Sequence, residues 1–135
     1  MRRGGNILCA AVIGLLGVEA AASDLPPLRE VARIDNGLLT LAIANEMQER
    51  CPDVAPRLIR AFLTLRNLRA TARDMGYSAA EIEAFVASDV EKARLRRRGT
   101  AWLEARGVDS RSDEDLCRLA QSEIRNETPV GRYLR

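Results

Sequence analysis

The 135-residue chain has no histidine, one lysine and five aromatic residues. Without histidine it lacks the commonest general base, metal ligand and near-neutral pH switch. Five aromatic side chains are too few for the stacking surface that binds single-stranded nucleic acid, so we expect no nucleic-acid partner. The remaining composition, 47% hydrophobic and 30% charged, is typical of one small globular domain rather than of a disordered chain.

The N-terminal segment, residues 1–22, has the layout of a secretory signal peptide. Two arginines near the start precede a charge-free run over residues 7–18, and three alanines end at Ala22. This pattern predicts cleavage after Ala22, with Ser23 as the near alternative, and therefore a periplasmic protein. The run is shorter than the roughly 18 apolar residues of a transmembrane helix. An uncleaved N-terminal anchor in the inner membrane is the alternative.

Only Cys51 and Cys117 remain after cleavage at that site. In an oxidising compartment an even pair of cysteines predicts a disulfide. A redox couple or a metal pair is the alternative, but the C-x-x-C spacing of the first and the further ligands of the second are missing. We therefore expect a structural bridge, no metal and no cofactor.

The hydrophobic spacing predicts an all-α fold, a small bundle of about four helices over residues 35–135, and offers no run that reads as a strand. Residues 23–34, which include two adjacent prolines, are expected to form an extended leader. The first helix is expected to begin with Asp35 as its N-cap and to end before Pro52.

The second helix is expected between Pro56 and Gly76. Over residues 58–65 only Arg60 and Thr64 are polar. A helix that is apolar nearly all round is usually surrounded by other elements, which predicts that this one is the central helix of the bundle.

A capping box predicts where the third helix begins. Ser78 is followed three residues later by Glu81, and Tyr77 and Ile82 are placed to form a hydrophobic staple. The apolar face of this helix does not continue past residue 93. We therefore expect a kink near Gly99 that turns Trp102 and Leu103 toward the core. The alternative is that the helix leaves the core at that point.

A fourth helix is expected to start at Ser110 or Ser112, because three acidic residues follow in its first turn. It would carry Cys117 near its start. The last residues, 130–135, form a short tail that is expected to dock through Tyr133 and Leu134.

Candidate catalytic groups each have a plainer structural role. Glu81 and Glu83 are two positions apart on a helix and point away from each other, and Ser78 has no histidine base to activate it. Lys92, a conceivable Schiff-base residue, is expected at a solvated helix position. We therefore expect no catalytic site and no small-molecule substrate, with a hydrolase as the alternative.

A cluster of basic residues interrupts an otherwise balanced charge distribution, since the cleaved chain has 19 basic and 18 acidic residues. It is a candidate partner-binding patch for an acidic protein or an anionic membrane surface. The plainer interpretation is a solvated face paired with acids of neighbouring helices. The patch comprises Lys92, Arg94, Arg96, Arg97 and Arg98, with Trp102 next to it.

Several stretches resemble a family of small exported alphaproteobacterial proteins called domain of unknown function 5333. They are Ile34-Asp35, Ala42-Ile43-Ala44 with Cys51, residues 72–78 (ARDMGYS) running into Glu81-Ile82-Glu83, residues 91–94 (EKAR), Cys117, Glu123-Ile124 and residues 131–134 (GRYL). The resemblance implies no assigned activity. It also implies gene neighbours from respiratory complex I and, for some members, the name of its E subunit. An iron–sulfur subunit needs four cysteine ligands for each cluster, and two cysteines cannot supply them.

These features together predict a non-enzymatic periplasmic interaction or accessory protein, associated in one version with an inner-membrane respiratory complex. A periplasmic acid or stress chaperone is the alternative, because loss of the 18 carboxylate charges in acid would leave 19 basic groups repelling one another.

Overall fold

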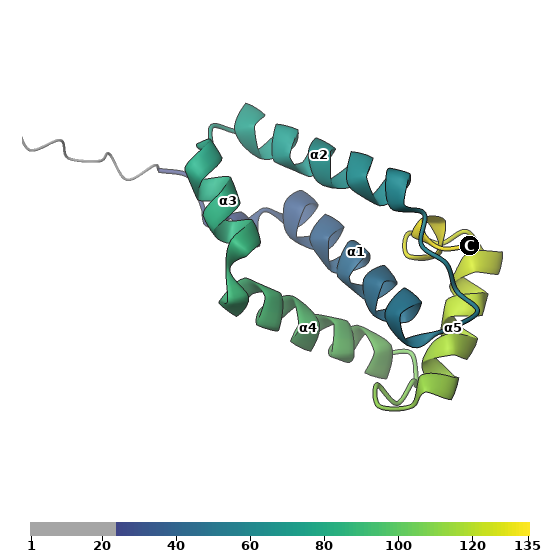
Figure 1. Cartoon of the computed structure of the whole chain (residues 1–135). Coiled ribbons are helices and arrows are strands. Elements are labelled where there is room, and N and C mark those ends of the chain that lie inside the picture. The colour runs from purple at the N-terminus through teal and green to yellow at the C-terminus, as the bar shows by residue number, and fades with distance from the viewer. Residues whose placement is uncertain (1–23) are drawn as a thin grey trace, which may run out of the picture.

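The computed structural model describes residues 24–135, which form an all-α fold as expected (Figure 1). These residues contain five α-helices rather than four, and no strand. The predicted signal peptide and the cleavage site at Ala22 or Ser23 lie outside the described residues. The helices are α1 (Ala32–Arg50), α2 (Leu58–Asp74), α3 (Ala79–Ala87), α4 (Asp89–Glu104) and α5 (Asp113–Arg125), with short 3-10 helices η1 (Leu28–Glu30) and η2 (Gly131–Tyr133).

The central helix is α1, and the expectation that the second helix is central is wrong. Figure 1 shows α1 between α2 and α4, with α3 and α5 at the two ends. α1 contacts α2, α4, α5 and both 3-10 helices. α2 approaches α1 closely because Gly37 has no side chain: a Cβ there would lie 3.0 Å from Leu68. Only one face of α2 is covered in this way, so its apolar character on the other sides does not reflect burial.

The segment expected to be an extended leader contains regular structure. Residues 28–30 form η1, and Leu28 is buried. α1 then begins at Ala32, so Asp35 lies within its first turn instead of capping it. The Asp35 carboxylate is buried against α4, where it has partners that an N-cap position would not offer.

The capping box at the start of α3 is confirmed. The Ser78 hydroxyl accepts from the Glu81 amide, and the Glu81 carboxylate accepts from the Ser78 amide at 2.7 Å. The staple residues Tyr77 and Ile82 lie in one core cluster. The preceding Gly76 ends its turn with a φ of 103°, a conformation that favours glycine.

A second capping serine, Ser88, divides the expected third helix into α3 and α4. Its backbone is extended and its side chain accepts from the Glu91 amide. α4 then runs unbroken through Gly99, so the kink expected there is absent. The helix is interrupted earlier, at Ser88. Because α4 begins anew there, the side of α4 that faces the core is not set by the apolar face of α3.

Because Gly99 sits in a regular helix, we expect Gly99→Ala to stabilise the protein. A Cβ at this position would lie 3.7 Å from Ile43, an ordinary van der Waals contact. Replacing a helical glycine by alanine gains about 0.5–1 kcal/mol in the free energy of unfolding. Urea unfolding monitored by circular dichroism measures this gain. A destabilised variant would show that α4 needs glycine here.

The main core lies where α1, α4 and α5 meet. The Sγ atoms of Cys51 and Cys117 lie 2.13 Å apart, at bonding distance, which agrees with the expected disulfide. This pair joins the end of α1 to the first turns of α5. Met47 and Leu116 pack beside it and are fully buried.

The C-terminal tail docks as expected. Leu134 is almost fully buried, and the Tyr133 hydroxyl hydrogen-bonds the Thr64 hydroxyl of α2 at 3.0 Å. Reciprocal backbone hydrogen bonds join Arg135 to Ala55. The tail therefore ends beside the N-terminus of α2.

Candidate interaction surface

Two arginines of the predicted basic patch bind inside the molecule. Arg94 and Arg98 extend from α4 to α1, where both guanidinium groups pair with the Asp35 carboxylate. Arg98 also donates to the Asn36 side chain at 3.1 Å. These two charges are therefore matched within the fold, as the plainer interpretation of the patch predicted.

Glu91 is the second buried acid of this network. It pairs with Arg94 at 2.7 Å and with Arg29 of η1 at 2.6 Å. Asp35 and Glu91 are only 6% and 4% exposed, so three arginines surround two carboxylates that have lost most of their water. The hydrogen bond that Arg94 donates to Asp35 raises the pKa of Arg94 against the opposing effect of burial. Arginine is charged below about pH 12 in any state, so this group adds no pH dependence near neutrality.

The rest of the patch lies at the surface. Arg96 and Arg97 are exposed and have no ion-pair partner within residues 24–135. Lys92 is 3.4 Å from the exposed Asp89. Trp102 is half-buried against the main core, and the Arg106 guanidinium stacks 3.5 Å from its ring centre, which leaves it little contact area for a partner.

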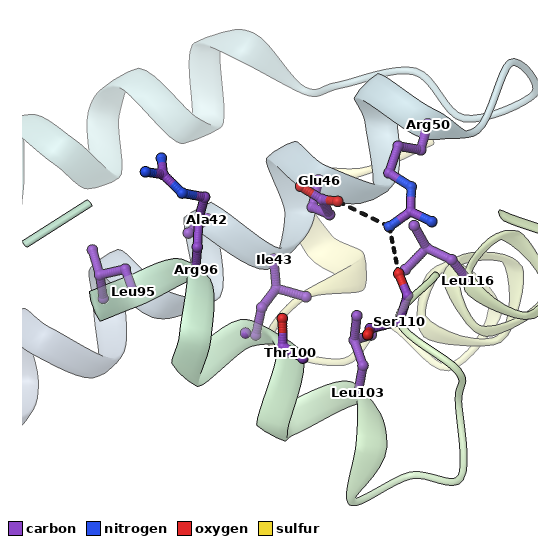
Figure 2. Close-up of a pocket in the computed structure, with 11 residues that line it drawn as sticks. Ala42, Ile43, Glu46, Arg50, Leu95, Arg96, Thr100, Leu103, Ser110 and Leu116 are labelled. Atoms are coloured by element: carbon purple, nitrogen blue, oxygen red, sulfur yellow. Dashed lines mark hydrogen bonds and ion pairs between the residues drawn. The ribbon is translucent and has the colours of Figure 1, made fainter. Parts of the chain in front are cut away.

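A pocket of about 150 Å³ lies between α1, α4 and the start of α5 (Figure 2). Ile43, Leu103 and Leu116 provide its apolar walls. Arg50 lies at one end and donates to Glu46 at 2.9 Å and to the Ser110 carbonyl at 2.8 Å. Arg50 also pairs with Asp113 at the start of α5, so it joins α1 to the α4–α5 connection and to α5, and most of its N–H donors are used within the fold.

The most unusual surface is the outer face of the first two turns of α2, which we call the α2 face. It consists of Leu58, Ile59, Phe62 and Leu63, which are 70%, 79%, 64% and 47% exposed. Figure 1 shows α2 along one edge of the molecule. Burying a side chain of this size stabilises a protein by about 1.5–3 kcal/mol, and the fold forgoes most of that here. A large exposed apolar patch with a polar rim is typical of an interaction site.

Arginines border the α2 face. A groove of about 580 Å³ runs beside it, where Leu58, Ile59 and Leu63 lie next to Arg57, Arg60 and Arg135. Arg57 and Arg60 donate to backbone carbonyls of the tail, at 2.9 and 3.0 Å, so their positions are fixed but their charges are not neutralised. Nearby charges are Arg132 and the single acid Glu127, which line the adjoining hollow. The border is therefore strongly positive.

Sequence reasoning missed this surface because it interpreted residues 58–65 as buried on all sides. The spacing did carry a signal. The apolar residues recur at i, i+1, i+4 and i+5, and no acid occurs between Asp53 and Asp74, where five arginines do. An apolar stripe with purely basic flanks is typical of a helix that lies at an interface.

Residues 24–135 include no group of three or more histidine, cysteine or acidic side chains arranged to hold a metal ion. In the same part of the chain, no helix combines the length and the hydrophobicity needed to cross a bilayer.

Comparison with known proteins gives one result. The model of a family of unknown function, DUF5333, matches residues 26–135, which includes every helix described above. No curated protein and no solved structure matches the chain. The chain belongs to the DUF5333 family.

Proposed function

We propose that this protein is an exported, non-enzymatic accessory protein that binds to the cell envelope through the α2 face. The observation that carries the proposal is the exposure of four large apolar side chains together on one helix. The fold is otherwise well satisfied: buried side-chain polar atoms within residues 24–135 all have partners. Because the buried polar groups of the domain have hydrogen-bond partners, the exposed apolar face stands out, and binding is the role that it favours.

The cysteine pair supports export, because a bridge of this kind persists in an oxidising compartment such as the periplasm. The positive border of the α2 face supports a location at the inner membrane, since anionic lipids and the acidic rims of membrane complexes both attract arginine. An accessory role beside a respiratory complex fits this location.

Fractionation of native cells tests the proposal. We expect the wild-type protein in the membrane fraction, and the Ile59→Ser/Phe62→Ser variant in the soluble periplasmic fraction, because the variant loses the two largest exposed apolar contacts. Val90→Ser is the matched control, since Val90 is a 70% exposed apolar residue on α4, and it should stay with the membranes.

The intact mass of the same protein tests export separately. Cleavage after Ala22 and formation of the bridge predict the mass of residues 23–135 less two hydrogens. Full-length protein with free thiols, or wild-type protein in the soluble fraction, would remove the proposal.

An acid or stress chaperone is the second candidate, and the α2 face also favours it because client proteins bind to exposed apolar surface. The test is aggregation of a client protein at about pH 2–3, where carboxylates protonate. Protection that the Ile59→Ser/Phe62→Ser variant loses would support a chaperone. Precipitation of the client at the same rate with and without the protein would rule it out.

A further inference from the structure

The α2 face combines an apolar surface with arginines on the same helix. Ile59, Phe62 and Leu63 lie on the side of α2 that points away from α1, because Leu68 and the buried Ala72 lie on the side toward it. Leu58, at the first residue of the helix, is exposed next to them. One turn further along the outer side, Arg66 follows Phe62 at i+4 and is exposed. A partner that covers the apolar turns therefore also meets guanidinium groups.

The charge beside this surface is mainly positive. Arg57 and Arg60 donate to neutral carbonyls, and Arg66 has no acidic partner within residues 24–135. On α2 itself only Asp74, at the far end, is acidic, and Arg69 alone has an ion-pair partner, Glu83 of α3. The N-terminal half of α2 thus presents apolar side chains between uncompensated positive charges.

We infer that the α2 face binds directly to the surface of an anionic lipid bilayer, an inference that rests on the proposed function and specifies its partner. Leu58, Ile59 and Phe62 enter the region between headgroups and acyl chains. Arg57, Arg60 and Arg66 contact lipid phosphates at the rim. This is the arrangement of an interfacial amphipathic helix, in which apolar burial and attraction to anionic lipid add together.

A bilayer fits this surface better than a second copy of this chain or a different protein does. A second copy placed face to face would bring the same arginines of both chains together, and like charges at close range oppose association. A protein partner would need an acidic rim around a groove shaped to a convex pair of helical turns. A bilayer deforms around projecting side chains and supplies phosphate at the depth where the arginines lie.

Sedimentation with protein-free vesicles tests the inference. The protein purified in its oxidised form is mixed with vesicles of phosphatidylcholine, or of phosphatidylcholine and phosphatidylglycerol in equal parts. We expect binding to the mixed vesicles and weak binding to phosphatidylcholine alone. Ile59→Ser/Phe62→Ser should weaken binding at least about tenfold. Arg60→Gln/Arg66→Gln should weaken it about fivefold for each arginine removed, and only on the anionic vesicles.

Two control variants are matched to these. Val90→Ser removes an apolar side chain of α4 that is about as exposed as Ile59 and Phe62. Arg96→Gln/Arg97→Gln removes two exposed, unpaired charges from α4. Both should bind like wild type. Circular dichroism of all variants confirms that they are folded. Losses as large in the controls as in the α2 variants would overturn the assignment to the α2 face.

The outcomes separate this inference from the proposed function. Membrane association in cells that depends on the α2 face, without binding to vesicles, would leave the proposed function standing and identify a protein partner, so the lipid inference would fail. A dimer in solution that Ile59→Ser/Phe62→Ser abolishes would identify a second copy and would equally overturn it.

A tryptophan placed at the surface gives an independent measurement. Phe62→Trp keeps the position apolar and reports its surroundings, with Trp102 half-buried elsewhere as a constant background. We expect its emission to move to shorter wavelength on anionic vesicles and to be quenched by brominated acyl chains. An unchanged spectrum at vesicle concentrations that sediment the protein would show that the α2 face does not enter the bilayer.

Discussion

Removal of the bridge by Cys51→Ala/Cys117→Ala is expected to cost about 4 kcal/mol in the free energy of unfolding. The two cysteines are 66 positions apart, so the bond closes a long loop and restricts the unfolded chain strongly. Domains of this size are stable by about 5–15 kcal/mol in total. Urea denaturation with a circular dichroism readout should show a large fall in the unfolding midpoint.

The reduced wild-type protein is the control for packing. It keeps both sulfur atoms, so it separates the loss of the cross-link from any cavity at Cys51, which is fully buried. Reduced wild type and the double variant should unfold at similar urea concentrations. Equal midpoints for oxidised and reduced wild type would show that the bond does not stabilise this fold.

The variant Asp35→Ala is expected to destabilise the protein by about 1.5–3 kcal/mol, because two partly buried arginines lose the carboxylate that accepts their hydrogen bonds. Asp35 is the common acceptor for Arg94 and Arg98, and these bonds hold α4 against the start of α1. Arg94 retains its ion pair with Glu91 of the same helix, so the variant mainly weakens the contact between α1 and α4. Unfolding in urea gives the magnitude, and hydrogen exchange should show early opening of α4.

Asp89→Asn is the matched control. Asp89 also pairs with a basic residue of α4, Lys92, but its side chain is 96% exposed. An exposed pair of this kind contributes at most about 1 kcal/mol, so the variant should be close to wild type. Similar losses for Asp35→Ala and Asp89→Asn would show that burial of the network is not what matters.

The interruption between α3 and α4 could have been predicted from the sequence. Ser88 and Glu91 repeat the spacing of Ser78 and Glu81, and in both cases the serine side chain accepts from the amide three residues on. The difference is that no glycine or proline precedes Ser88, so the hydrophobic periodicity suggested a continuous helix. A local hydrogen bond was enough to end one helix and begin another.

The position of α2 at the edge of the fold, in contrast, could not be predicted from the sequence. Residues 58–65 are apolar on several sides, which fits a central helix as well as a helix with one face on α1 and one face toward a partner. Periodicity reports that a side chain is apolar and not what covers it. The same limit applies to Arg94 and Arg98, whose partner Asp35 lies about sixty residues away in the sequence.

The sequence by itself determined the all-α class, the capping box at Ser78, the cysteine pairing and the docking tail, because each depends on local spacing or on there being only two cysteines within residues 24–135. The tertiary structure alone decided that α1 is central, that two patch arginines are used inside the fold, and that the α2 face is uncovered. Those features depend on which helices meet, and contacts between distant segments leave no periodic trace in the chain.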